Sequence, residues 1–309
     1  MKPSAVGDET LGQVSPDGLS AAGAMTLKPH GLMDPGQISL DRPKRIWCIC
    51  KAIELDMAYI NLNMFLATRH NLLLWTGLFI ALPGVLLAPT KGPKCTKPAI
   101  RREWRTLSPS QQDAFHKAVK CLQTKPSRIQ SGGVSKTLYD DYTYIHLQLE
   151  PLIHQVAALY PWHRYFNSLR EKDMQACGYT QPHPYWDWTR DAASASAFRN
   201  ASIFDPIHGF GSPSAPEGNT TVVCVDNGPY AGFQFFLHHA QFDRLWTLWQ
   251  GRNATRLSDY QGNTIQNTTV FNATLQDTLD FMGLGDNRSV ESVMDTLSNG
   301  LCYKYDDDE

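Results

Sequence analysis

The chain has 309 residues, of which 42% are hydrophobic and 19% charged, with a formal net charge of −2 and a pI of about 6.5. This composition is that of an ordinary globular protein long enough to bury one sizeable core. The near-neutral charge excludes an extended basic surface or acidic tract, so we expect neither a nucleic acid nor a basic protein as partner.

The first 88 residues divide into two segments that precede the expected domain. Residues 1–63 are polar, are interrupted by Gly and Pro and lack a sustained hydrophobic period, which predicts a disordered or spurious N-terminal extension. Residues 64–88 have the layout of a secretory signal peptide, with Arg69 ahead of an apolar run over 72–88. That run is short for a membrane helix, although an uncleaved membrane anchor remains the alternative. We expect the folded domain to cover 89–309.

Sequons and cysteines bear on the compartment. Asn-x-Ser/Thr sequons in the last third of the chain exceed the number that chance would supply, and they begin at Asn200, Asn219, Asn253, Asn267, Asn272 and Asn287. The chain has 7 cysteines, which fit no zinc-binding spacing. Their scatter after residue 90 predicts long-range disulfides together with one unpaired thiol. Combined with the signal-like segment, these features favour a secreted glycoprotein.

The expected domain contains four helical segments. A capping box begins the first at Ser108, with Pro109 at the first helical position. The second is expected over about 139–150, the third over about 161–178 and the fourth over about 235–250. Residues 179–233 are rich in Pro, Gly, Asn and Ser and should be mostly loop. The pattern predicts a mainly α domain built on a four-helix bundle with long loops.

Three of the 10 histidines lie around a reversal of the chain. His146 is near the end of the second predicted helix, His154 just past the proline that ends it, and His163 near the start of the third. Neutral imidazoles brought together in this way suit copper, zinc or nickel. From spacing alone, core histidines are about as plausible as metal ligands. We expect His116 to lie at the surface. His183 and His208 are expected in loops, without a special role.

Longer motifs favour the metal interpretation. They are the stretches Trp162–Phe166, Tyr185–Trp188 and Phe235–Trp246. These motifs resemble the tyrosinase and catechol oxidase family, most of all its short secreted fungal members, and the resemblance extends from Cys95 to Tyr305. It implies a helical bundle with two copper ions, each held by three histidines. Members of the family use O2 to oxidise phenols to catechols or catechols to quinones, so phenolic small molecules and O2 are the expected partners.

The resemblance assigns individual residues to the two copper sites. By position, His146, His154 and His163 match the three ligands of the first copper, and His239 matches the third ligand of the second. Asp243, one turn after His239, could orient that site without binding the metal.

The match to the family fails at the second copper site. Relatives carry its other two ligands as His-x-x-x-His on a helix, and this chain has no such pair anywhere. Only residues 231–234 separate two flanks, ending at Tyr230 and beginning at Phe235, that relatives hold much farther apart. The sequence therefore predicts an internal deletion that removes one bundle helix and exposes apolar surface on its neighbours.

Two functional hypotheses follow. The first is a copper-dependent oxidoreductase of the tyrosinase kind that binds one copper ion rather than two and oxidises phenols poorly or not at all. The second is a secreted copper-binding glycoprotein without catalysis. An O2 carrier of the haemocyanin kind would need the same six histidines, and a hydrolase would need motifs that this sequence lacks.

Overall fold

The computed structural model describes residues 94–211, 228–229 and 235–307. The predictions for 1–63 and 64–88 lie outside the described residues, as do the sequon at Asn219 and three of the cysteines, namely Cys48, Cys50 and Cys224. Within the described ranges, no helix is both long enough and apolar enough to cross a membrane.

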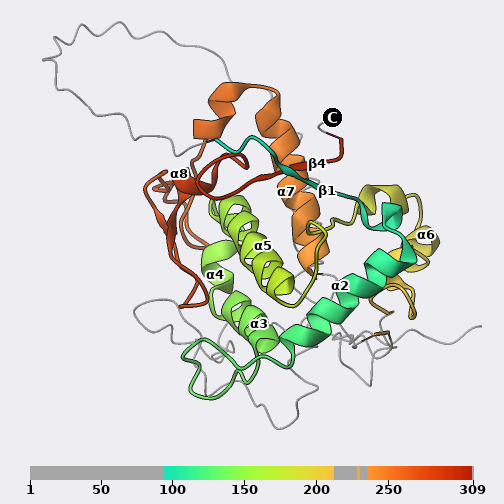
Figure 1. The fold of residues 1–309 in the computed structure, drawn as a ribbon. Helices are drawn as coiled ribbons and strands as arrows, with labels where there is room; N and C mark the ends of the chain where they lie inside the picture. Colours follow the sequence, from blue (N-terminus) through green and yellow to red (C-terminus); the bar gives the residue numbers. More distant parts are fainter. Residues whose placement is uncertain (1–93, 212–227, 230–234, 308–309) are drawn as a thin grey trace, which may run out of the picture.

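Four long helices make up the centre of the fold, close to the predicted positions (Figure 1). They are α2 (Pro109–Leu122), α3 (Leu138–Gln148), α5 (Leu159–Ala176) and α7 (Phe235–Gly251). Three short helices accompany them, namely α4 (Glu150–Ile153), α6 (Ala195–Arg199) and α8 (Val290–Val293). Single 3-10 turns fill several connections: η2 (Trp104–Thr106), η3 (Trp188–Asp191), η4 (Ser202–Phe204) and η5 (Ala254–Ser258). The predicted mainly helical class is confirmed.

Capping explains where two of these helices begin. The Ser108 hydroxyl accepts a hydrogen bond from the Gln111 backbone N–H, and the Gln111 side chain accepts one from the Ser108 N–H, as the sequence predicts. Thr137 and Asp140 form the same reciprocal pair at the start of α3. At the other end of α5, Gly178 adopts φ +87°, a conformation that a side chain would disfavour, and the chain turns there.

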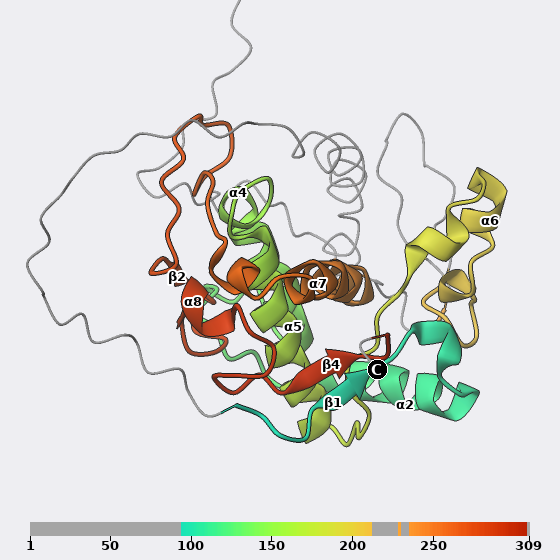
Figure 2. The same ribbon diagram turned by 90° about the horizontal axis from the view of Figure 1, so that it is seen from above.

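Strands and disulfides join distant parts of the chain. Strand β1 (Ala99–Arg101) pairs in parallel with β4 (Tyr303–Tyr305), and the two lie side by side in Figure 2. Beside them, Cys95 is bonded to Cys302, 207 residues later, and Cys121 at the end of α2 is bonded to Cys177 at the end of α5. A second, antiparallel pair is formed by β2 (Thr278–Leu279) and β3 (Arg288–Ser289). The predicted long-range disulfides are confirmed, whereas the predicted unpaired thiol stays a prediction.

Helices α5 and α7 pack against each other at the heart of the molecule, as both views show (Figures 1 and 2). All residues of α7 from Phe235 to Asp243 are buried. The large apolar side chains that are exposed in the described part of the chain all lie in loops: Ile207, Ile265, Val270 and Phe271. Among the described residues, the bundle helices therefore lack the exposed apolar face that we expected, and the first half of α7 is buried.

Candidate metal centre

Four histidines meet inside the bundle. One ring nitrogen from each of His146, His154, His163 and His239 lies within 4.8 Å of those of the others. Helices α3, α5 and α7 supply three of them, and His154 is the residue at which α4 ends. His146 is partly exposed, whereas the other three are buried. The structure thus brings together every histidine that the sequence singled out as a candidate ligand.

The rings are arranged as two neighbouring groups. The Nε2 atoms of His146 and His154 are 3.1 Å apart. The rings of His163 and His239 are stacked, with centroids 3.8 Å apart and planes inclined by 6°. Because imidazole lone pairs lie in the ring plane, two parallel rings direct theirs along separate planes. The cluster nitrogens of these two rings nevertheless lie within 4.8 Å of each other and of the other two.

Hydrogen bonding leaves ring nitrogens available for a metal. The Nδ1 of His163 lies 2.7 Å from the Leu159 carbonyl and donates to it, so its Nε2 keeps the lone pair. That Nε2 is buried and has no hydrogen-bond partner among the described residues, and the same holds for the Nδ1 atoms of His154 and His239. Buried polar atoms are normally paired, so the unpaired Nε2 of His163 inside the histidine cluster fits a metal ion that would bind it.

The electrostatics of the cluster favour neutral imidazoles. Burial lowers the pKa of all four rings, and repulsion from neighbouring histidines adds to this for His146, His163 and His239. Only a neutral imidazole can bind a metal, so these rings are ready to act as ligands at neutral pH. The set contains no carboxylate. An all-nitrogen set of this kind suits copper or zinc rather than magnesium or calcium.

Asp243 lies behind the cluster and holds α7 in place. Its carboxylate accepts hydrogen bonds from Arg164 Nε at 2.5 Å and from the hydroxyls of Tyr303 and Tyr305 at 2.6 and 2.7 Å. Arg101 Nη1 lies 3.4 Å away. Although burial opposes the charged form, the two guanidinium groups hold the pKa of Asp243 below its usual value. The carboxylate therefore ties α7 to α5, β1 and β4 as an anion.

These contacts place two candidate ligands relative to each other. Arg164 follows His163 directly on α5, and Asp243 lies one turn after His239 on α7. The Arg164–Asp243 ion pair therefore sets how far α5 can slide along α7, and with it the stacking of the two imidazoles. None of the hydrogen bonds found for Asp243 in the described residues reaches a histidine, so an influence on the metal would act through the helices.

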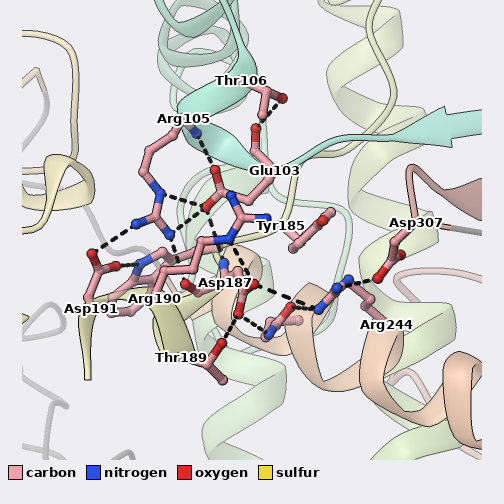
Figure 3. A network of polar contacts seen from close by, with 12 residues as sticks. Glu103, Arg105, Thr106, Tyr185, Asp187, Thr189, Arg190, Asp191, Arg244 and Asp307 are labelled. Atoms are coloured by element: carbon pink, nitrogen blue, oxygen red, sulfur yellow. Dashed lines mark hydrogen bonds and ion pairs between the residues drawn. The ribbon is translucent and has the colours of Figure 1, made fainter. Parts of the chain in front are cut away.

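A second polar network holds the other side of α7 (Figure 3). Asp187 accepts a hydrogen bond from Gln241 Nε2 at 2.8 Å and lies 4.0 Å from Arg244. Arg105 joins this network from the start of the domain, with ion pairs to two carboxylates, Glu103 at 2.8 Å and Asp191 at 2.9 Å. In the sequence, Asp187 stands out only as part of the Tyr185–Trp188 motif. Its contacts with Gln241 and Arg244 could not be predicted, because these residues lie more than 50 positions away.

One histidine prediction was wrong. His116 is buried rather than at the surface, with the rings of Trp104 and Phe210 at 5.4 and 5.0 Å. It is enclosed because η2 and the segment around Phe210 cover this face of α2. Neither of the two loop histidines belongs to the cluster. His183 is fully buried beside Arg170, and His208 is exposed.

Hydrogen bonds from a later loop support the turn at His154. This bracing loop contains Asn263 and Gln266, and Asn263 lies 108 residues after Gln155 of the turn. Asn263 Nδ2 donates to the Gln155 carbonyl at 3.1 Å, and the Asn263 carbonyl accepts from the Ala157 N–H at 3.0 Å. The backbone N–H of Gln266 donates to the Pro151 carbonyl at 3.1 Å. Gln155 itself has φ +53°, a conformation that needs such support in a residue other than glycine. No local pattern in the sequence points to this contact.

We expect Asn263→Ala to weaken copper binding by about tenfold, because the His154 turn would lose the side chain that holds it. The free energy of unfolding should fall by only about 1 kcal/mol, the usual worth of a hydrogen bond. Copper affinity is measured by competition with a chelator. Asn253→Ala, which removes an exposed amide that caps η5, is the matched control. Equal affinities of the two variants would contradict the role given to Asn263.

We expect the metal-free protein to lose stability as the pH falls below about 6.5, the pKa of an unperturbed histidine. Burial, aided by the nearby positive charge of Arg170, holds the pKa of His183 well below that value in the folded state. The unfolded chain therefore takes up a proton that the folded protein does not, so stability is full above pH 6.5 and declines below it. Denaturant unfolding at several pH values gives the free energy of unfolding as a function of pH. Below pH 6.5 the slope of this curve should correspond to about one proton fewer in His183→Gln than in the parent chain. An unchanged slope would contradict this.

Comparisons with known proteins agree with the histidine cluster. Residues 136–235 match the model of the common central domain of tyrosinase. Tyrosinase ustQ of Aspergillus flavus is 31% identical to this chain, and the alignment covers 70% of the chain and 82% of ustQ. The chain belongs to the tyrosinase family. Tyrosinase-like protein phomQ1 of Diaporthe leptostromiformis is 29% identical, over 69% of the chain and 79% of that protein.

A solved structure shows the tyrosinase-family fold. A polyphenol oxidase from Thermothelomyces thermophila superposes with a TM-score of 0.59 at 22% identity, over 69% of this chain and 90% of that one. The ustQ alignment also bears on the predicted deletion. It runs over 299 residues but takes in only 70% of this 309-residue chain, so ustQ has residues within the alignment that have no counterpart here. An internal deletion in this tyrosinase-family chain would produce that difference.

Proposed function

We propose that this chain is a copper-dependent oxidoreductase of the tyrosinase kind and that its copper centre is incomplete. It would then bind one copper ion and oxidise phenols slowly or not at all. The observation that carries the proposal is the cluster of His146, His154, His163 and His239. The family resemblance implies six ligands, and the cluster found in the described residues contains four.

The first three histidines would hold the ion. His163 offers Nε2 because its Nδ1 is engaged with the Leu159 carbonyl, and His154 is held at the end of α4 by the bracing loop. His146 is the partly exposed member of the three. Copper bound there would supply a redox-active ion able to exchange electrons with O2 and a phenol.

The second position has too few ligands to retain a metal. Of the three ligands that the resemblance implies for this position, the described residues supply only His239, whose ring is parallel to that of His163. Phe235 rather than a polar side chain packs there, with its ring 4.3 Å from those of His146 and His239. A single imidazole competes poorly with water and buffer for copper, so we expect this position to remain empty of metal in solution.

The proposal includes secretion and glycosylation. Two disulfides join segments that are far apart in the sequence, and such bonds persist in oxidising compartments. The sequon asparagines in the described residues are all exposed, as N-glycosylation requires: Asn200, Asn253, Asn267, Asn272 and Asn287. The signal-like segment at 64–88 is the proposed means of entry into the secretory pathway.

Copper content and catechol oxidation, measured on the same purified sample, test the proposal. We expect about one copper ion per chain and quinone formation far below that of tyrosinase ustQ assayed alongside. Two ions per chain, or turnover equal to that of the relative, would overturn the idea of an incomplete centre. A chain that binds no copper would overturn the copper proposal itself.

A secreted copper-binding glycoprotein without catalysis is the second candidate, favoured by the same shortage of ligands. The two functions differ in what copper-loaded protein does to catechol. Quinone formation above that of free Cu(II), absent when His163 is replaced by glutamine, indicates an oxidoreductase. A rate equal to that of free Cu(II) indicates a binding protein.

A further inference from the structure

The loop that braces His154 ends in an exposed apolar tip. Phe271 is 78% exposed and Val270 is 58% exposed, and Ile265 on the same loop is 38% exposed. No aromatic partner is found for Phe271 in the described part of the chain. Exposed large side chains gathered in one place indicate a surface that something covers, or a liability to self-association.

The tip is held away from the body of the protein. At its base, the Ala273 N–H donates to the Gly262 carbonyl at 3.0 Å, and the Thr274 hydroxyl donates to Asp277 at 2.7 Å. On the other strand of the loop, Asn263 and Gln266 are bonded to the His154 turn. These bonds hold the two ends of the loop, and Phe271 and Val270 between them are exposed.

Two sequons flank the tip, Asn267-Thr-Thr and Asn272-Ala-Thr. Both asparagines are exposed, and Asn272 directly follows Phe271. The side-chain amide oxygen of Asn272, Oδ1, accepts a hydrogen bond from the Thr264 hydroxyl at 3.1 Å, which fixes the side chain. Its Nδ2, the atom that bears an N-linked sugar, donates no hydrogen bond to any described residue. The amide is therefore presented next to the apolar side chains with its nitrogen accessible.

We propose that Asn272 is N-glycosylated and that the first sugars of this glycan cover Phe271 and Val270. In the reaction, Nδ2 loses one proton and bonds to the anomeric carbon of a lipid-linked oligosaccharide, and the lipid pyrophosphate leaves. Sugar rings present C–H groups on their faces and hydroxyls at their edges. One face can therefore lie on an aromatic ring while the edges stay in water.

This inference rests on the proposed secretion but not on copper binding. A second chain or a partner protein would be the other way to cover Phe271. The adjacent sequons favour sugar, because a glycan on Asn272 would stand between such a partner and the ring. Copper content and glycan occupancy are measured independently, so either proposal can fail while the other holds.

The full chain is produced by a eukaryotic secreting cell, and the occupancy of each sequon is read by mass spectrometry of its peptides. We expect Asn272 to be occupied. Removal of glycans from the folded protein with a peptide N-glycosidase, and the substitution Asn272→Gln, should each strengthen self-association by roughly tenfold, as measured by sedimentation. Adding Phe271→Ser to Asn272→Gln should restore the monomer.

Asn253→Gln is the matched control. It removes an exposed sequon asparagine at the start of η5, a turn that contains none of the exposed large apolar residues. This variant should remain as monomeric as the parent protein. The proposal is overturned if secreted protein lacks a glycan at Asn272, if deglycosylation leaves self-association unchanged, or if Phe271→Ser fails to reverse the effect of Asn272→Gln.

Discussion

Asp243→Ala is expected to destabilise the domain by about 3–5 kcal/mol, the cost of leaving a buried charge without its ionic partner. That charge is Arg164, whose side chain is fully buried and pairs with Asp243. Arg101, also fully buried, would lose a weaker contact but keep its ion pair with Glu171 at 2.6 Å. The Tyr303 hydroxyl would lose its acceptor as well, whereas that of Tyr305 could still donate to the Ala240 carbonyl at 3.0 Å. A loss of this size is comparable to the whole stability of many domains, so the variant should unfold at a much lower urea concentration or fail to accumulate.

The control for this prediction is the exposed member of another ion pair. Arg190 lies 3.1 Å from Asp187 and its side chain is 54% exposed, so Arg190→Ala should change the free energy of unfolding by less than about 1 kcal/mol. Urea unfolding followed by circular dichroism compares the two variants. If both shift the midpoint equally, the Asp243 network does not hold the bundle together as described.

His163→Gln is expected to lower copper affinity by more than about 100-fold, above the effect of losing a group that only supports a ligand. The imidazole has its Nδ1 engaged with the Leu159 carbonyl and its Nε2 unpaired, so little else in the described structure depends on that nitrogen. The stability of the metal-free protein should change little by comparison. Competition with a chelator of known affinity gives the copper constant.

His208→Gln is the matched control for the ligand substitution. It also removes one histidine, but from an exposed position outside the cluster. We expect it to bind copper as the parent chain does. If the His163 variant keeps the parent affinity, or if both variants lose copper equally, the cluster is not the copper site.

The sequence predicted the helices well because their signals are local. The capping box at Ser108 and the apolar spacing after it need only a few neighbouring residues to be recognised. His146, His154 and His163 lie within 18 residues, around one reversal, and the family motifs marked them together. His239 came from its own motif on a helix far along the chain.

Other features could not be predicted because they depend on contacts between distant segments. Nothing near Asn263 shows that its amide supports the turn after His154. The burial of His116 likewise depends on Trp104 and Phe210, which reach it only once the chain has folded. The parallel stacking of His163 and His239 depends on how α5 lies along α7, and periodicity within one helix carries no information on that.

The pairing of β4 with β1 has a consequence for the order of events during synthesis. Tyr303 and Tyr305 are among the last residues of the chain, and they complete the hydrogen bonds of Asp243 on the helix that carries His239. Cys302 forms its disulfide with Cys95 at the other end of the domain. Residues up to Tyr305 must therefore have been synthesised before the histidine cluster is fully supported. We expect the proposed copper loading to follow the pairing of β4 and the formation of this disulfide.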